Sequence, residues 1–135
     1  MTPFPHDIDI CAPIGQARRL MMKHKVRHLP VTQNRKLKGL ISDRDIKLIL
    51  GPEFDYPDPK DLTVEDAMVE DPYVVALDTS LIIVLDEMAA RHIGTALVMK
   101  GDRVAGIFSA SDACRELSNL LKQEFPDSTG GSDAA

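Results

Sequence analysis

Hydrophobic positions along this chain show two kinds of spacing, which alternate from one stretch to the next. In some stretches apolar residues recur every three or four positions, the spacing that places them on one face of a helix. In others they form short runs, paired across a few polar residues that favour a turn, which predicts β-hairpins. The predicted elements are extended segments at 7–10 and 73–77, first helices at 14–21 and 81–88, hairpin strands at 29–32 with 37–41 and 95–99 with 104–108, and second helices at 43–50 and 110–121.

The same order of elements occurs twice because the sequence contains an internal repeat. Sliding the chain by sixty-seven residues aligns positions 5–50 with positions 72–117 without a gap. Seven further pairs of apolar positions, from Ile8/Val75 to Leu40/Ile107, match in kind, as a duplication requires. The identical pairs are Pro5/Pro72, Met21/Met88, Val31/Val98, Gly39/Gly106, Ser42/Ser109, Asp45/Asp112 and Leu50/Leu117.

One repeat of this size cannot bury its own apolar faces, so we expect the two to pack about an approximate twofold axis. This predicts a mixed α/β (α+β) fold of two repeats, each built as extended segment, helix, strand, strand and helix, with two similar clefts between them. We assign repeat 1 to residues 1–50, a proline-rich connector to 51–63 and repeat 2 to 64–122. Residues 123–135 lack apolar anchors, and we expect a disordered tail there.

Composition and charge narrow the class of protein. A chain of 135 residues with 44% apolar and 27% charged residues is globular and has room for one core. Its net charge of −5 is not accompanied by a basic stripe, which argues against nucleic-acid binding. No apolar run approaches the roughly 18 residues of a membrane span, and the N-terminus lacks a signal-peptide pattern. We therefore expect a cytoplasmic protein that does not bind a membrane.

Several kinds of chemistry have no support in the sequence. The two cysteines and four histidines do not show metal-ligand or disulfide-framework spacing, so we predict no metal site. No GxSxG, P-loop or GxGxxG motif occurs, and neither cysteine has a base positioned near it in the sequence. We therefore predict a protein that is not an enzyme.

The motif that repeats with most chemical content is a serine followed by an aspartate three residues later, at the start of each second helix. These pairs are Ser42 with Asp45 and Ser109 with Asp112. The pattern is that of a capping box, in which the two side chains bond the backbone of the first helical turn. A carboxylate beside a hydroxyl can also receive the cis-diol of a ribose. Both roles are compatible with one another.

The motifs together resemble those of a tandem pair of cystathionine-β-synthase (CBS) domains, a Bateman module. The resemblance covers nearly all of residues 1–122 and is most specific at Val26–Val31, VRHLPV, and Gly39–Asp45, GLISDRD. It implies a non-catalytic regulatory or sensor module that binds an adenosine-containing ligand, such as AMP, ADP, ATP or S-adenosylmethionine, between the repeats. The alternative is a dimerising interaction scaffold with the same fold that binds no nucleotide.

The resemblance also implies which residues would hold each part of such a ligand. The ribose residues are Ser42, Asp45, Ser109 and Asp112. The phosphate residues are Arg27, His28 and Arg44, since an arginine fork gives two charged hydrogen bonds to phosphate. The adenine residues are Met68, Tyr73 and Ile93 in the first cleft and His6 and Val26 in the second, and Met68 and Ile93 could equally be core.

The phosphate residues distinguish the two clefts in the sequence. Opposite Arg27, His28 and Arg44, repeat 2 has the uncharged Gly94, Thr95 and Ser111. We therefore predict that the cleft of Ser42 and Asp45 is the better nucleotide site. The cleft of Ser109 and Asp112 is expected to be weak, empty or occupied by a less negatively charged ligand.

The resemblance further implies a homodimer and an effector protein that the sequence does not identify. We expect the second helices to supply dimer contacts, including Leu117, Leu120 and Leu121. At the sixty-seven-residue offset Met1 falls opposite Met68, so the sequence begins within the family's lead-in segment.

Overall fold

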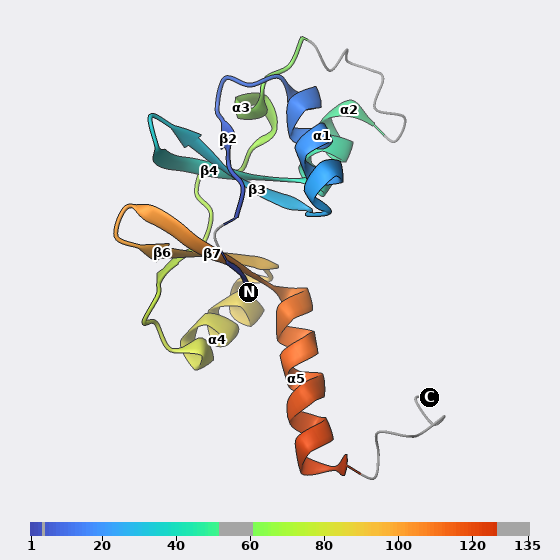
Figure 1. Cartoon of the computed structure of the whole chain (residues 1–135), viewed down its shortest axis with the longest axis vertical. Helices are drawn as coiled ribbons and strands as arrows, with labels where there is room; N and C mark the ends of the chain where they lie inside the picture. Colours follow the sequence, from blue (N-terminus) through green and yellow to red (C-terminus); the bar gives the residue numbers. More distant parts are fainter. Residues whose placement is uncertain (4, 52–60, 127–135) are drawn as a thin grey trace.

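The computed structural model describes residues 1–3, 5–51 and 61–126 (Figure 1). All the predicted helices and strands are present, together with a short N-terminal strand and a one-turn helix that were not predicted. In chain order the elements are β1 (Thr2–Pro3), β2 (Ile8–Asp9), α1 (Ile14–His24), β3 (His28–Gln33), β4 (Lys36–Ser42), α2 (Asp43–Leu50), α3 (Val64–Ala67), β5 (Val74–Ala76), α4 (Leu81–Arg91), β6 (Thr95–Lys100), β7 (Arg103–Ser109) and α5 (Ala110–Glu124).

The predicted tail and connector fall largely outside the described residues. Helix α5 continues to Glu124, so the first two residues of the predicted tail are helical, and residues 127–135 lie outside the described residues. Most of the predicted connector, 52–60, lies outside them as well. Within the described ranges, no helix combines the length and apolarity needed to cross a membrane.

The strands form two sheets, one for each repeat. Repeat 1 has the order β2-β3-β4, and repeat 2 has β7-β6-β5 with β1 added at the β7 edge. In each repeat the hairpin is antiparallel and the short extended strand pairs with it in parallel. Both hairpins shift register at equivalent positions, after Val31 and after Val98. The duplication and the mixed α/β fold are therefore confirmed.

The segment leading into each repeat crosses to the sheet of the other repeat. Thr2 pairs with Ile107 of β7. Val69 forms a bridge with Leu40 of β4, in which the Leu40 amide donates to the Val69 carbonyl at 3.0 Å and the Val69 amide donates to the Leu40 carbonyl at 2.8 Å. These two pairings are related by the sixty-seven-residue offset. Leu40, Leu97 and Ile107 also form a small buried cluster that joins the two sheets. The repeats are thus related by an approximate twofold axis, as predicted.

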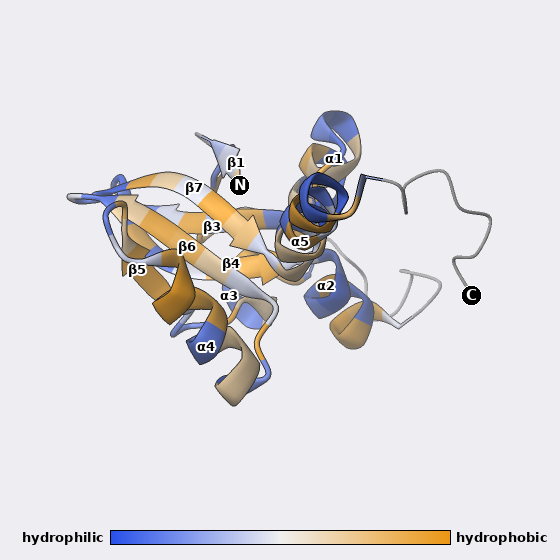
Figure 2. Cartoon of the chain, turned by 90° about the horizontal axis from the view of Figure 1, so that it is seen from below, coloured by the Kyte–Doolittle hydropathy of each residue, from blue (hydrophilic) through white to orange (hydrophobic). Residues whose placement is uncertain are grey.

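The two repeats are not equally well enclosed by helices. In repeat 1, α1 and α2 pack against each other, and Ile46 and Leu50 of α2 are buried in the core. In repeat 2, α5 contacts β7 but has no buried residue, and α4 and α5 stand apart in both views (Figures 1 and 2). The reason lies in the sequence, because Ala113 and Glu116 of α5 occupy the positions of the apolar Ile46 and Ile49 of α2.

Candidate functional site

Both Ser–Asp pairs form the predicted capping boxes. The Ser42 amide donates to Asp45 Oδ2 at 2.8 Å, and the Asp45 amide donates to Ser42 Oγ at 3.1 Å. At the start of α5 the corresponding distances between Ser109 and Asp112 are 2.9 and 3.2 Å. Each aspartate is therefore held at the end of a hairpin strand, where the strand gives way to a helix.

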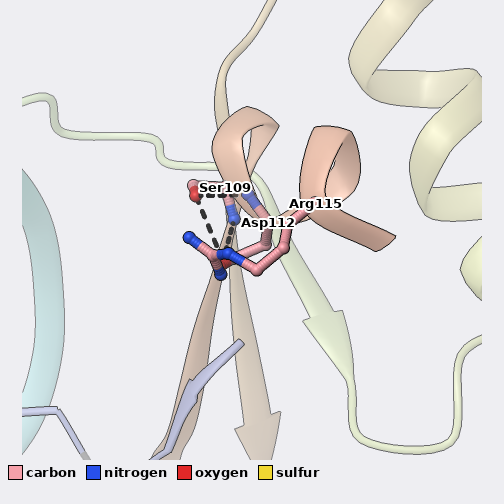
Figure 3. Close-up of polar contacts among 3 residues, drawn as sticks. All are labelled: Ser109, Asp112 and Arg115. Carbon is pink, nitrogen blue, oxygen red and sulfur yellow. Dashed lines mark hydrogen bonds and ion pairs between the residues drawn. The ribbon is translucent and has the colours of Figure 1, made fainter. Parts of the chain in front are cut away.

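The carboxylate of Asp112 is held on both of its oxygens (Figure 3). Oδ2 accepts from the amide and hydroxyl of Ser109, and Oδ1 accepts from Arg115 Nη1 at 3.1 Å. Burial by itself raises the pKa of Asp112, but the hydrogen bonds from Ser109, the positive N-terminus and Arg115 outweigh it and lower the pKa. Asp112 is thus ionised at neutral pH and can accept further hydrogen bonds if Arg115 moves.

A cavity of about 780 Å³ opens beside Asp112, between the two repeats. Repeat 2 contributes the residues around the start of α5, and repeat 1 contributes its lead-in and the turn between α1 and β3. The lining residues are Thr2, Pro3, Pro5, His6, His24, Lys25, Val26, Arg27, His28, Gly94, Thr95, Ile107, Ser109, Ala110, Ser111, Asp112 and Arg115. A volume of this size is within the range of small-molecule sites.

Two stacked imidazole rings form part of the cavity wall. The ring centroids of His6 and His24 are 3.6 Å apart and the ring planes are inclined by 17°. Partial loss of solvent contact, followed by repulsion from His6 and Lys23, lowers the pKa of His24. The equivalent pair in the other repeat is Tyr73 with Arg91, whose guanidinium carbon lies 5.2 Å from the ring centroid. The equivalent positions of the two repeats therefore carry paired side chains of different chemistry.

His28 lies where the two repeats meet. Its Nε2 is 3.3 Å from the Thr95 hydroxyl, and these two residues occupy equivalent positions in the repeats. Contact between equivalent positions places both of them beside the approximate twofold axis. Burial lowers the pKa of His28, and Arg27 adds to this effect, while the carboxylates of Asp45 and Asp43 oppose it. His28 is thus neutral at pH 7 and is close to the aspartates of its own repeat.

The family comparison agrees with the internal repeat. The family model described as "CBS domain" matches residues 8–51 and 64–119. The chain belongs to the CBS-domain family. One curated relative of this CBS pair is a zinc metalloprotease of Methanocaldococcus jannaschii, 34% identical over 128 residues, which are 94% of the chain. The chain spans about a third, 34%, of the length of that relative.

Solved structures of similar fold include a hexameric protein and a pair with two bound small molecules. A hexameric CBS-CP12 protein from bloom-forming cyanobacteria is 27% identical with a TM-score of 0.73, and the match covers 96% of this CBS pair and 71% of that chain. A CBS domain pair in complex with 5′-methylthioadenosine and S-adenosyl-L-methionine is 24% identical with a TM-score of 0.72, covering 86% and 90%. At 24% identity, the similarity to this ligand-bound pair shows a shared fold and no more.

The structure brings some of the predicted site residues together and separates others. His6 and Val26 line the same cavity as Ser109 and Asp112. Arg27 and His28 line it too, although the sequence comparison assigned them to the cleft of Ser42 and Asp45. The physical reason is that the turn before β3 lies near the twofold axis, so its side chains reach a cleft whose aspartate belongs to the other repeat. The absence of basic residues within repeat 2 therefore does not leave its cleft without positive charge.

The remaining predicted residues lie elsewhere. Arg44 is exposed in the first turn of α2 and does not line the cavity of Asp112. Met68 packs against the core of repeat 1, and Tyr73 and Ile93 pack against that of repeat 2. These contacts are compatible with the core role that the sequence left open for Met68 and Ile93.

Sequence reasoning missed three ionisable residues of the cavity: Lys25, His24 and Arg115. Arg115 follows Asp112 by three positions on a helix, so both lie on the same face, and this spacing was a usable signal. Lys25 ends α1 with φ of 55°, a left-handed conformation that turns the chain toward β3. Its position could not be predicted from spacing, because it depends on how the repeats pack.

Among the described residues no group of three or more His, Cys, Asp or Glu is arranged to hold a metal.

The lowered pKa of His28 predicts an acid-sensitive fold. Because the folded state resists protonation of His28 and the unfolded state does not, stability from this residue is present above its ordinary pKa of 6.5 and is lost as the pH falls below it. We expect the melting temperature of the wild type to fall more between pH 8 and pH 5.5 than that of His28→Gln, which cannot titrate. Parallel pH profiles for the two proteins would contradict this prediction.

Proposed function

We propose that this CBS pair is a non-catalytic regulatory module, working in the cytoplasm, that binds an adenosine-containing ligand between its repeats. The observation that carries the proposal is the cavity beside Asp112, which collects an ionised carboxylate, a hydroxyl, stacked rings and several cations from both repeats. This set matches the diol, base and phosphate of a nucleotide better than it matches any one simpler ligand.

We assign residues of the cavity to the ribose, the phosphate and the base of the ligand. The ribose diol donates to Asp112 beside Ser109, replacing Arg115 on Oδ1. That exchange costs little, because the Arg115 side chain is 66% exposed and its ion pair is screened by water. The released guanidinium then joins Lys25 and Arg27 around phosphate, with neutral His28 as a further hydrogen-bond partner. The base lies against His6 and Val26.

The balance of charge in the cavity favours an anionic ligand. Lys25, Arg27 and Arg115 face one carboxylate, Asp112, so the cavity has an excess of positive charge. AMP, ADP and ATP carry negative phosphates, whereas S-adenosylmethionine carries a sulfonium cation. We therefore propose an adenine nucleotide as the ligand in preference to S-adenosylmethionine.

The cleft of Ser42 and Asp45 is proposed as a second site of the same kind. Ser42 and Asp45 would hold the ribose, and Arg44 the phosphate. Met68, Tyr73 and Ile93 would border the base, with the Arg91–Tyr73 pair in the place that the two histidines take in the other cleft. This site is proposed as the weaker one, since Arg27 and His28 line the cavity of Asp112.

Regulation follows from where the ligand is held. Groups from both repeats contact it, so it favours the arrangement of the repeats in which all these groups reach it at once, and only through that difference in affinity. We propose that an effector protein reads this arrangement. The matching segment of the M. jannaschii relative forms part of a larger protein named as a protease, which supports the proposal that such pairs act on an attached or associated domain.

The decisive experiment is a thermal-unfolding panel. Samples contain AMP, ADP, ATP, S-adenosylmethionine or 5′-methylthioadenosine, the last two because they are bound to a pair of the same fold. A nucleotide at about 100 times its dissociation constant should stabilise the fold by roughly 2.7 kcal/mol. We expect the three phosphorylated compounds to raise the melting temperature more than the other two. If none of the five raises it, the scaffold that binds no nucleotide becomes the better account.

A homodimer is the proposed assembly. It is supported by the exposed apolar residues Leu117, Leu120 and Leu121 on α5. The hexameric cyanobacterial protein of similar fold and 27% identity also supports self-association.

A further inference from the structure

A second cavity lies between the hairpins of the two repeats, close to the turns that join their strands. Figure 1 shows both turns on the same side of the molecule. We call it the hairpin cavity, and its lining includes Thr32, Arg35 and Leu37 of the first hairpin and Asp102, Arg103 and Val104 of the second. Its volume of about 380 Å³ is roughly half that of the cavity beside Asp112 and within the range of small-molecule sites.

The lead-in to β2 divides the hairpin cavity from the cavity beside Asp112. Pro5 lines both cavities, whereas His6 lines only the cavity beside Asp112 and Asp7 lines only the hairpin cavity. Successive side chains of an extended segment point to opposite sides, which explains this alternation. No other described residue lines both cavities. The hairpin cavity is therefore a compartment of its own, outside the proposed nucleotide site.

Four charged side chains line the hairpin cavity, two of each sign. Repeat 1 contributes Asp7 and Arg35, and repeat 2 contributes Asp102 and Arg103. Asp7 is held in place by the Thr32 hydroxyl, which donates to its Oδ2 at 2.8 Å. Within the part of the chain that the structure describes, neither arginine forms an ion pair with either carboxylate. The four groups are therefore available to a ligand, and their formal charges sum to zero.

Arg35 occupies a backbone position that favours glycine. The turn between β3 and β4 has positive φ at both central residues, 52° at Asn34 and 68° at Arg35. This is the pattern of a type I′ turn, for which Asn followed by Gly is preferred because a Cβ atom is strained at positive φ. The equivalent turn of repeat 2 places its positive φ of 62° at Gly101. An arginine in place of the favoured glycine costs stability, which points to a role for its side chain.

The hairpin cavity also has an apolar lining. Leu37 and Val104, at equivalent positions of the two repeats, both line it. Both are partly buried and pack on the small cluster that joins the two sheets. Because this cluster fixes their positions, the apolar part of a ligand can bind them without reorganising the protein.

We propose that the hairpin cavity binds a free amino acid with an apolar side chain. Arg35 and Arg103 bind its carboxylate, since the planar guanidinium fork matches carboxylate geometry. Asp7 and Asp102 bind its ammonium group, and its side chain lies on the apolar lining. A zwitterion matches four charges that sum to zero, whereas the phosphates of a nucleotide would meet no excess of positive charge. The site is additional to the proposed nucleotide site and does not depend on it.

Calorimetric titration of the full chain, without nucleotide, is the first test. Valine, leucine and methionine are the probes, and we expect leucine to bind with a dissociation constant in the millimolar range or below. Two analogues serve as matched controls: 4-methylpentanoate lacks the ammonium group of leucine, and 3-methylbutylamine lacks its carboxylate. We expect neither analogue to bind measurably. No binding of any of the three amino acids at millimolar concentration, or binding of either analogue as tight as that of leucine, would overturn the proposal.

Substitutions in the first hairpin are the second test. Arg35→Gly is expected to raise the melting temperature, because glycine relieves the turn, and to weaken leucine binding by about tenfold or more, because a charged hydrogen-bond donor is lost. The matched control is Lys38→Gln, which removes an exposed positive charge from the same hairpin outside the cavity and should leave the affinity unchanged. Unchanged leucine affinity in Arg35→Gly, or an equal loss in Lys38→Gln, would contradict the assignment. AMP binding by the same proteins reports separately on the cavity beside Asp112.

Discussion

Replacing Asp112 by Asn is expected to weaken AMP binding by about 100-fold or more. The ionised carboxylate is the proposed acceptor for both ribose hydroxyls, and hydrogen bonds to a charged group are worth about 1.5–3 kcal/mol each. Losing most of two such bonds corresponds to about two powers of ten in affinity. Asparagine keeps a side-chain oxygen that can accept from the Ser109 amide, so the capping box of α5 is largely preserved. Isothermal titration calorimetry with AMP measures the effect.

The matched control is Asp45→Asn, which makes the same change at the equivalent position of repeat 1. We expect it to alter the AMP affinity of the stronger site by no more than about threefold, because Asp45 does not line the cavity beside Asp112. Strong loss in Asp45→Asn with normal binding in Asp112→Asn would instead place the better site in repeat 1. That result would restore the ranking of the clefts predicted from the sequence.

Replacing Gly39 by Ala is expected to destabilise the fold by about 2–3 kcal/mol, in the upper range for inserting one methyl group where there is no room. A Cβ atom at Gly39 would lie 2.5 Å from the carbonyl oxygen of Val69 and 2.9 Å from Met68 Sδ. The carbonyl is backbone, and Val69 is paired with Leu40 in the bridge between the repeats. The methyl group can be accommodated only by opening that bridge. Chemical denaturation of the wild type and the variant measures the loss.

Gly106→Ala supplies the control at the equivalent position. There the three atoms nearest the added Cβ all belong to the side chain of Met1, the nearest being Sδ at 2.5 Å. Since the end of a methionine side chain can rotate away, we expect a loss below about 1 kcal/mol. Equal losses in both variants would show that the backbone contact of Val69 is not what makes Gly39 necessary.

The fold was predictable because the spacing of apolar residues and the internal duplication both predict the same order of helices and strands. The three- and four-residue spacing in 14–21 and 81–88 gave both first helices, and the polar turns gave both hairpins. The pairing of Thr2 with β7 and of Val69 with β4 was not predictable, since segments this short have no periodicity of their own.

The site was predictable where it depends on one element and not where it depends on packing. Ser109 and Asp112 belong to one helix start, and the sequence identified them as a pair. Arg27 joins them only because the turn before β3 lies near the twofold axis, which no comparison of aligned positions can reveal. The exposure of Leu117 had a visible signal in Ala113 and Glu116, which replace apolar residues of repeat 1.

The unequal cores of the two repeats have a consequence for how the protein opens. Repeat 1 encloses a large cluster that includes Ile14, Leu29 and Ile46, whereas the cluster of repeat 2 is smaller and its second helix, α5, adds only the partly buried Ala113 to it. Regions with few buried apolar contacts exchange their amide hydrogens through local opening at lower free energy than the rest of a protein. Repeat 1 is therefore the more rigid half of the protein and repeat 2 the looser half. Binding at the cavity beside Asp112, or at the exposed apolar face of α5, should be measurable as increased amide protection in repeat 2.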